Sequence, residues 1–562
     1  MKTTIKSYKI GICFLSAAFF LNACTKNFGE LNTNPNLVTS PDVKFLFTYA
    51  ADRLPASTTE WIWESLEQLM RYTQQVSASP YELSGNVNTR YRAYYADILP
   101  NLIEIRHQID QKEDKDRYQK MRALTYIVGV YYGIRVTDLN GSIPYSEAML
   151  ARYQDKFDPV FDPQQQLFTL WLSELDNAIQ VLSDMNMADQ ENYGNADIYY
   201  QGDWIKWVKL ANTLKLRIAV RLEHQDEEAT RRIFREVMQD ATGPIDSDEG
   251  QLQYMNPTQA FLGADVDYRS RRFASRQMVT FMKSAADPRI RIYFDQNDLV
   301  GAFRDTLSKY NAQLPTFIDP ADPLIMYQGG PADWTTDQNV AQWMGNPFQV
   351  SQYSRYFLIS PVNRLFLSPK LNGATGNALH VLVTYAETCF YIAEGIQKGY
   401  GAGIDTKGSA ADWYNKGIAS SIRTMNKVAQ EAGSTTAFAG DGEAEIQAYQ
   451  QHPQIALGSA NDLERIYIQQ YLAFFRLPNE AYVLCRRTGY PVAGSSYYPM
   501  ESFNEPIPRR FGINDPGEVN RANWETAYQE QGFTLRAVDA QTLSQERVWY
   551  DKNAPTFGNG NQ

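Results

Sequence analysis

The clearest fold signal lies in residues 203–222, which read DWIKWVKLANTLKLRIAVRL. Apolar side chains recur there at steps of three and four residues, and three lysines lie off the apolar stripe. This spacing matches the period of an α-helix that buries one face. Asp203 stands directly before the stripe, where its carboxylate can accept hydrogen bonds from the first free N–H groups of a helix. The segment therefore predicts an amphipathic helix of about five turns, capped by Asp203.

Six further segments show the same helical period. They are RYRAYYADILPNLIEIRHQI (90–109), YQKMRALTYIVGVYYGIRV (118–136), QQQLFTLWLSELDNAIQVLSD (164–184), HVLVTYAETCFYIAEGI (380–396), ADWYNKGIASSIRTMNKV (411–428) and LERIYIQQYLAFFRL (463–477). Pro478 is expected to end the last of them and Pro100 to interrupt or kink the first, because proline lacks the N–H that a helix interior needs. Helices joined by modest loops suggest helix pairs stacked as in tetratricopeptide-like arrays, although no strict repeat period is visible.

The domain organisation follows from where these helices lie. A length of 562 residues would by itself suggest about three or four domains. However, the helical segments occur on both sides of an irregular region at about 240–379, and stacked helix pairs share one continuous core. We therefore expect a mostly α fold, a single large domain of tetratricopeptide-like stacked helix pairs with long irregular loop insertions. It would span residues 41–562, with a second irregular stretch from residue 488 onward.

The chain begins with MKTTIKSYKIGICFLSAAFFLNAC, in which three lysines precede an apolar run. This pattern is typical of a secretory signal, and the run is too short to span a membrane. It leads into Leu21-Asn22-Ala23-Cys24, which resembles the lipobox of bacterial lipoproteins. We expect residues 1–23 to be a signal peptide, Cys24 to carry lipid that holds the protein on a membrane, and residues 24–40 to be a tether. An ordinary cleavage site followed by an incidental cysteine is the alternative.

Charge and cysteine content limit the partners and the covalent chemistry. The formal net charge is −11, and loss of residues 1–23 would remove three lysines and no acid, giving −14. Nucleic acid is not an expected partner, because phosphate binding needs clustered Lys and Arg. Cys389 and Cys485 would remain in the fold, where an oxidising compartment would permit a disulfide between them. The apolar run around Cys389 favours a buried free thiol instead.

No sequence pattern supports catalysis, a metal site or a cofactor. No dinucleotide or phosphate-binding loop is complete, and DSDEG at 246–250 lacks the rest of a calcium loop. A pair of carboxylates for glycoside hydrolysis stays an alternative, because two of the 64 acidic residues could lie at the required separation. We expect no enzyme activity and no cofactor, with a surface hydrolase as an alternative. The histidines, which form no metal-ligand pattern, are His107, His224, His380 and His452.

Seven motifs occur in order along the chain. They are FGELNTNPN after the lipobox, TDLNGSIPYSEA (137–148), YQGDWIKWVKLANTLKLRIAVRL (200–222), DPRIRIYF (287–294), TYAETCFYIAEG (384–395), LERIYIQQYLAFFRLPNEAYVLCRRTGYP (463–491) and IPRRF (507–511). Together they resemble the SusD/RagB family of outer-membrane nutrient-binding lipoproteins, in its second SusD-like branch.

This resemblance implies a tetratricopeptide-like fold that sits as a lid on a SusC-type, TonB-dependent barrel transporter and faces the extracellular medium. The lid would capture a glycan or an oligopeptide and deliver it to the barrel. Thr25-Lys26-Asn27 lack the acidic residues that often mark surface export, so the extracellular placement rests on the resemblance. The alternative function is a protein-interaction scaffold of an outer-membrane complex that binds no small ligand.

Aromatic side chains on irregular segments are the expected ligand contacts, since their faces stack on sugars and peptides. Trp61 and Trp63 are two residues apart, so on a helix they cannot both face one core, and one of them is expected to be exposed. The full set of candidates is Trp61, Trp63, Tyr72, Tyr81, Trp334, Trp343, Tyr353 and Tyr356.

We expect structural roles for several paired arginines and for one glycine. Arg217 and Arg221 lie one turn apart in segment 203–222 and are expected to pair with acids inside the helix stack. The doublets Arg486-Arg487 and Arg509-Arg510 are expected to clamp loops, with binding of an acidic ligand as the alternative. Gly141 is expected to permit a tight turn between helices.

Overall fold

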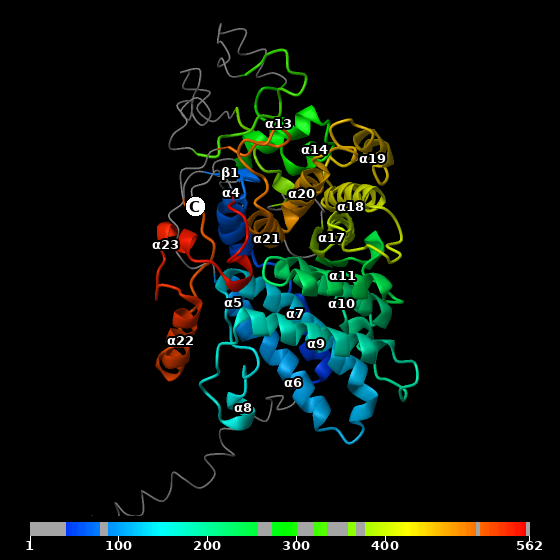
Figure 1. The fold of residues 1–562 in the computed structure, drawn as a ribbon. Helices are drawn as coiled ribbons and strands as arrows, with labels where there is room; N and C mark the ends of the chain where they lie inside the picture. The colour runs from blue at the N-terminus through cyan, green and yellow to red at the C-terminus, as the bar shows by residue number, and fades with distance from the viewer. Residues whose placement is uncertain are drawn as a thin grey trace, which may run out of the picture.

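The computed structural model describes residues 41–78, 88–256, 272–300, 318–333, 358–366, 377–501 and 506–557 (Figure 1). Most of them are helical. The α-helices are α3 (Val43–Asp52), α4 (Met70–Tyr72), α5 (Thr89–Ala93), α6 (Leu99–Asp110), α7 (Gln119–Asn140), α8 (Ala151–Gln154), α9 (Gln164–Ser183), α10 (Trp204–Leu222), α11 (Glu227–Gln239), α13 (Arg276–Ser284), α14 (Ile290–Tyr293), α17 (Tyr385–Gln397), α18 (Ala410–Glu431), α19 (Glu443–Gln450), α20 (Asp462–Ala473), α21 (Pro478–Thr488), α22 (Arg521–Gln531) and α23 (Ala540–Gln545).

Shorter elements complete the described chain. The π-helical segments are η1 (Glu60–Leu69) and η2 (Tyr94–Ile98), and the 3-10 turns are η3 (Lys115–Tyr118), η4 (Gly194–Ala196), η5 (Asp248–Gly250), η7 (Arg364–Phe366), η9 (Phe474–Arg476), η10 (Glu518–Asn520) and η11 (Trp549–Asp551). The strands are β1 (Val76–Ser77), β2 (Leu252–Asn256), β3 (Phe273–Ala274) and β4 (Ala378–Val383). β1 pairs with β3 and β2 with β4, both antiparallel.

Successive helices pack side by side along the chain. In the lower half of Figure 1, α3 packs on α6, α6 on α7, α7 on α9 and α9 on α10. α10 then contacts α11 and α17, and α17 packs against α18 and α20 in the upper half. One hydrophobic cluster runs through both halves, from Phe47 of α3 to Tyr449 of α19. The prediction of a mostly α, single-domain fold of stacked helices is therefore confirmed.

Helix α10 begins as predicted but is buried more completely than its pattern suggested. The side chain of Asp203 accepts hydrogen bonds from the backbone N–H groups of Ile205 and Lys206, at 3.0 and 3.2 Å, which confirms the cap. Lys215 lies off the apolar stripe, yet only 6% of it is exposed. Its ammonium group lies 2.6 Å from Asp176 of α9. Because α9, α11 and α17 all pack on α10, even its polar side is largely covered.

One predicted helix starts as a strand. The segment 380–396, predicted to be helical throughout, begins within β4 and becomes helical only from Tyr385. β4 pairs with β2, far away in the sequence, so a distant partner overrides the local period. The two prolines behave as expected. Pro100 lies in the first turn of α6, directly after the π-turn η2, and Pro478 ends the run of α20 and η9 and opens α21.

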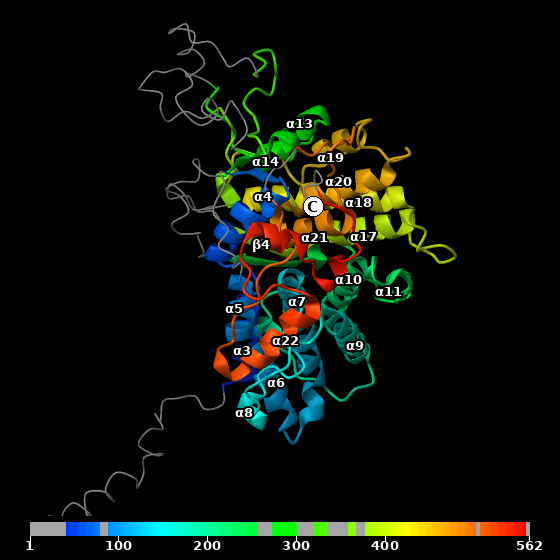
Figure 2. The same cartoon turned by 60° about the vertical axis from the view of Figure 1, so that its left-hand side comes forward.

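The carboxy-terminal segment 506–557 packs across both halves of the stack, and Figure 2 shows α22 lying in front of the lower helices. The backbone N–H of Phe511 donates to the carbonyl of Leu139 at 2.7 Å, and that of Ser142 donates to Gln531 Oε1 at 2.9 Å. Gly141 adopts a φ of 72°, and a Cβ there would overlap the Gln531 amide. The predicted glycine turn is confirmed, whereas the tail expected to be irregular carries α22 and α23.

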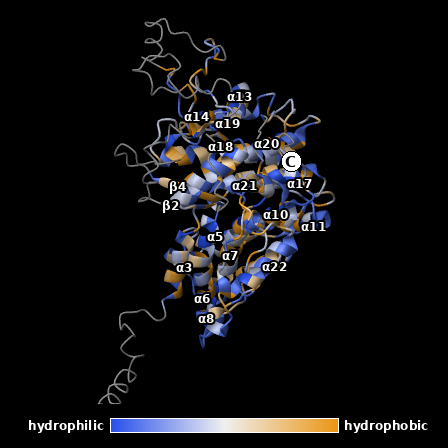
Figure 3. Ribbon diagram, turned by 90° about the vertical axis from the view of Figure 1, so that its left-hand side faces the viewer, coloured by the Kyte–Doolittle hydropathy of each residue, from blue (hydrophilic) through white to orange (hydrophobic). Residues whose placement is uncertain are grey.

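No helix within the described ranges is both long and apolar enough to cross a membrane. Figure 3 shows hydrophilic and hydrophobic residues mixed along these helices, as expected for helices that bury one face in a core. The predicted signal peptide (1–23), the lipid-attachment residue Cys24 and the tether (24–40) lie outside the described residues.

Candidate functional site

A network of buried ion pairs joins four helices at the centre of the molecule. Arg217 of α10 donates to both carboxylate oxygens of Glu387 of α17, each at 2.7 Å. Arg221, one turn later, donates to Asp138 of α7 at 2.8 and 2.7 Å and to Glu480 of α21 at 3.0 Å. All five side chains are at most 3% exposed. The predicted pairing of both arginines with acids inside the stack is confirmed.

The two arginine doublets hold α21 and the carboxy-terminal segment in place. All four arginines are buried. Arg486 donates to the backbone carbonyls of Asp138 and Arg509, at 2.8 and 2.7 Å, and so joins α21 to α7 and to the tail. These contacts confirm the predicted clamp and favour it over an acidic ligand. The remaining pairs are Arg487 with Glu394 at 2.6 Å, Arg509 with Asp551 at 2.6 Å, and Arg510 with Glu546.

Both cysteines of the described chain are buried free thiols. Cys389 lies in α17 and Cys485 in α21, and no disulfide joins them. Burial raises the pKa of each thiol, which keeps both protonated and unreactive at neutral pH. The preference for a buried Cys389 is confirmed, and the thiols serve packing.

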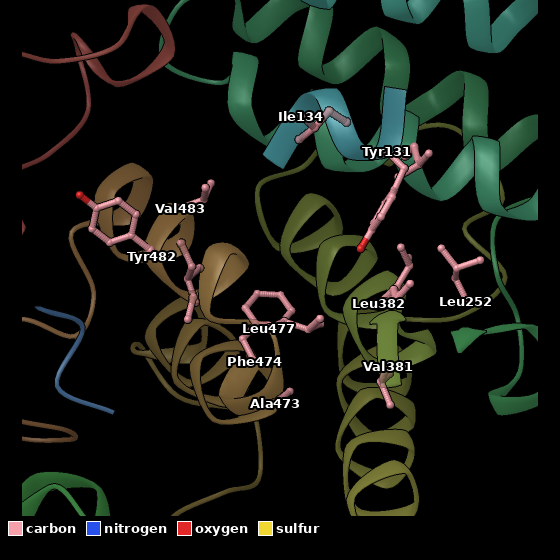
Figure 4. Close-up of a cluster of buried hydrophobic side chains, with 14 of the residues drawn as sticks. Tyr131, Ile134, Leu252, Val381, Leu382, Ala473, Phe474, Leu477, Tyr482 and Val483 are labelled. Carbon is pink, nitrogen blue, oxygen red and sulfur yellow. The ribbon is translucent and has the colours of Figure 1, made fainter. Parts of the chain in front are cut away.

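A small cavity, which we call the arginine cavity, lies where η1, β4 and the start of α21 meet. Its volume is about 60 Å³. Figure 4 shows part of its wall, where Tyr131 reaches from α7 toward Leu382 of β4, with Leu477 on the other side. The residues that line it are Ala56, Trp61, Ser65, Arg90, Tyr131, Arg135, Arg217, His380, Val381, Leu382, Arg476, Leu477, Pro478, Asn479 and Glu480.

Arg476 is the unusual residue of this cavity. Its guanidinium lies 4.3 Å from the centre of the Trp61 ring and 5.3 Å from that of Phe366. Its Nε and Nη1 atoms are buried and have no hydrogen-bond acceptor in the part of the chain that the structure describes, and burial lowers its pKa to about 10. A cation–π contact contributes up to about 2 kcal/mol, whereas burying a charge costs several kcal/mol. Arg476 is only partly buried, so its two aromatic rings and its remaining contact with water share the cost of removing this cation from solvent.

Three of the predicted aromatic contacts lie in the described chain. Trp61 is 4% exposed and donates its indole N–H to the carbonyl of Phe366 at 2.8 Å, and Tyr72 is 1% exposed. Trp63 is 40% exposed, which confirms that one of the two tryptophans faces outward. Ligand contact by these residues stays a prediction. The candidates outside the described residues are Tyr81, Trp334, Trp343, Tyr353 and Tyr356.

A wide polar groove runs between segment 246–251 and helix α18. Its volume is about 830 Å³. Asp248 on one wall accepts a hydrogen bond from Ser420, so the DSDEG stretch forms the side of a groove. Across the described ranges, no group of three or more His, Cys, Asp or Glu side chains is arranged to hold a metal ion. The remaining polar lining includes Gln251, Arg423, Thr424, Asn426, Lys427 and Gln430, side chains that can hydrogen-bond to hydroxyl groups.

Sequence reasoning missed Arg476, His380 and the α18 side of the groove. Arg476 carried a signal, because it is the only charged residue between Arg465 and Glu480. The groove carried none, since it exists only where segment 246–251 meets a helix far along the chain. His380 lies in β4, where burial and the nearby Arg476 lower its pKa to about 4.

Comparisons with known proteins place this fold. A SusD-like family model, described as "Starch-binding associating with outer membrane", matches residues 35–513. A solved chitin-binding protein shares 21% identity and a TM-score of 0.66, with 91% of this chain and 100% of that chain covered. A chitin-binding SusD homologue from Flavobacterium johnsoniae shares 20% identity and a TM-score of 0.63, with 92% and 100% covered. A SusD homologue from Bacteroides fragilis shares 18% identity and a TM-score of 0.65, with 91% and 100% covered.

No curated protein matches the chain. The solved structures establish the shared fold, and the family model extends from the predicted tether to beyond α21. SusD-like proteins bind nutrients and are not enzymes, which agrees with the expected lack of catalytic activity. The chain therefore belongs to the SusD-like family of nutrient-binding proteins that associate with the outer membrane.

Proposed function

We propose that this protein captures an oligosaccharide at the outer surface of the outer membrane and passes it to a SusC-type, TonB-dependent barrel transporter. The observation that carries the proposal is the family match over residues 35–513, whose description names starch and the outer membrane. The two chitin-binding proteins of the same fold support a saccharide over an oligopeptide. Lipid on Cys24, with residues 24–40 as a tether, would hold the helical body at the membrane.

The proposed contacts for the saccharide are aromatic faces with hydrogen-bonding groups beside them. Sugar rings present apolar C–H faces that stack on tryptophan and tyrosine, while their hydroxyls need polar partners. Trp63 presents such a face on η1. We keep Trp61, Tyr72, Tyr81, Trp334, Trp343, Tyr353 and Tyr356 in the proposed set, and we add the polar groove beside α18 as a surface for hydroxyl groups.

Calorimetry of the purified protein with chitooligosaccharides, maltooligosaccharides and short peptides tests this function. We expect a saccharide to bind, and the variants W63A, W334A and W343A each to bind it about fivefold more weakly, since one stacking contact contributes about 1 kcal/mol. F45A is the matched control, because Phe45 is 74% exposed on α3 and is not a proposed contact.

Each other outcome has a definite meaning. Binding of peptides alone would support the capture role but would show that the ligand is a peptide and not a saccharide. Binding of neither class, together with stable association with a barrel, would favour the protein-interaction scaffold and contradict the proposal. Unchanged saccharide affinity in all three tryptophan variants would remove these aromatic contacts.

A further inference from the structure

The arginine cavity carries a positive charge that the described chain does not balance. Arg90 and Arg135 both lie beside Glu60, at 3.4 and 2.5 Å, and Arg217 pairs with Glu387. By contrast, none of the described acids lies within ion-pair distance of Arg476, and burial lowers the pKa of its guanidinium. Three of the four lining arginines thus have a carboxylate partner, and the fourth has two aromatic rings.

The hydrogen-bond donors around the cavity point to the same imbalance. Among the described residues, Nε and Nη1 of Arg476 have no acceptor, and neither has Nε of Arg90. Ser65 and Tyr131 also line the space and each bring a hydroxyl group. Figure 4 shows the Tyr131 hydroxyl directed from α7 toward Leu382. A partly buried site in which several donor atoms lack an acceptor favours a ligand that accepts hydrogen bonds.

Size and surroundings restrict that ligand further. A cavity needs about 10–15 Å³ to hold one water molecule. A volume of about 60 Å³ therefore holds a few groups of that size, which matches a carboxylate. Val381, Leu382 and Leu477 supply apolar walls that strengthen the attraction between opposite charges. We propose that the arginine cavity is a binding site for a small carboxylate anion, whose charge Arg476 balances.

A carboxylate could come from two sources, a free ion such as acetate or the acidic group of a captured nutrient. The site is argued from the cavity alone, so it does not depend on the proposed capture of a saccharide. Melting temperatures of the purified protein with added sodium acetate test it directly, at constant ionic strength set with a bulky sulfonate buffer. A disaccharide that ends in a uronic acid, compared with its neutral counterpart, tests the second source.

We expect acetate to raise the melting temperature of the wild-type protein with the logarithm of its concentration, because a ligand that binds only the folded state stabilises it. R476Q should weaken the acetate effect at least about tenfold, as expected for loss of a charge-assisted contact. R476K, which keeps the charge, should retain part of the effect. R232Q is the matched control and should keep all of it, since Arg232 is 59% exposed on α11 and pairs with Glu236 at the surface.

The possible results separate cleanly. An effect of the uronic acid alone that disappears in R476Q would support the site and assign the carboxylate to a nutrient. An acetate response that is the same in R476Q and wild type, or no response to either carboxylate, would overturn the proposal. Binding of the neutral saccharide is measured alongside, so a failure of the capture function is recognised separately. Circular dichroism of R476Q and R476K shows whether each variant is folded.

Discussion

Glu394 shows how much one buried residue contributes to this fold. Arg487 donates to its two carboxylate oxygens at 2.6 and 2.7 Å, and Lys398 lies at 2.8 Å. The side chains of Glu394 and Arg487 are 2% and 1% exposed. Burial opposes ionisation of Glu394, but Arg487 and Lys398 outweigh it and lower its pKa. We expect E394Q to lower the free energy of unfolding by about 3–5 kcal/mol, because it removes a buried carboxylate and leaves Arg487 and Lys398 to share that of Glu223.

Urea denaturation of E394Q measures this cost, with E227Q as the control. Glu227 pairs with Arg231 at 3.2 Å on the surface of α11, where both side chains are about half exposed. Such exposed pairs contribute about 0–1 kcal/mol. Equal losses of stability in the two variants would contradict the view that the buried network holds the helices together.

Glu480 gives the fold a defined response to acid. Burial alone would raise its pKa, but Arg217 and Arg221 outweigh burial and lower that pKa to about 2. An unfolded glutamate has a pKa of about 4.3. A carboxyl whose pKa is lower in the folded state stabilises the fold above the unfolded pKa and loses that contribution as the pH falls through the folded pKa.

We therefore expect the difference in unfolding free energy between wild type and E480Q to be about 3 kcal/mol near neutral pH and to shrink between about pH 5 and pH 2. Denaturation curves at a series of pH values measure it. A difference that stays constant over this range would show that Glu480 is not held ionised by the two arginines.

The kinds of contact made by these residues could be predicted from the sequence, but their partners could not. The position of Arg217 and Arg221 in an apolar helix predicts acid partners. Their acids come from three other helices, α7, α17 and α21, and no local pattern identifies them. Arg476 could have been noticed as a lone charge in an apolar run, yet its stacking on Trp61 depends on a contact far along the chain.

Helix packing in the upper half depends on a glycine of α17. A Cβ on Gly395 would overlap the ring of Phe234 from α11, with Cδ2 of that ring at 2.7 Å. Alanine favours a helix over glycine by about 1 kcal/mol, but overpacking a core costs about 1–3 kcal/mol. We expect G395A to be destabilising overall, as measured by thermal unfolding.

Gly129 of α7 is the matched control for this substitution. It also lies in a buried helix, but a Cβ there would have its nearest neighbour at 3.6 Å, an ordinary contact. G129A should be neutral or stabilising by up to about 1 kcal/mol. If G395A proves as stable as G129A, the close approach of α11 and α17 does not limit the packing.

Most of the helices could be predicted from the sequence, because the spacing of apolar residues within a single segment is enough to indicate a helix. Segment 203–222 is the clearest case, with its cap and its stripe both as expected. The error in segment 380–396 has the opposite cause. HVLV is a short apolar run compatible with helix or strand, and pairing of β4 with β2 settles it.

The whole molecule combines a stack of helices with a carboxy-terminal segment that ties its halves together. Asn140 of α7 donates to the carbonyl of Gly512 at 2.6 Å, and Arg486 of α21 donates to that of Arg509 at 2.7 Å. The fold class and the family could be predicted from the sequence, since the motifs are spread along the whole chain. The ligand surface could not be predicted. Its proposed aromatic residues come from two segments that are far apart in the sequence, and a groove forms only when such segments meet in the fold.

The central claim is capture of a saccharide at the cell surface by a lipid-anchored protein. Intact cells of the source bacterium that carry wild-type protein or C24A are incubated with a fluorescent oligosaccharide that binds the purified protein, and surface-bound label is measured. We predict that wild-type cells retain the label and that C24A cells lose most of it, with the protein released from the membrane fraction. Equal surface label on both cells, or none on wild-type cells, would contradict the account.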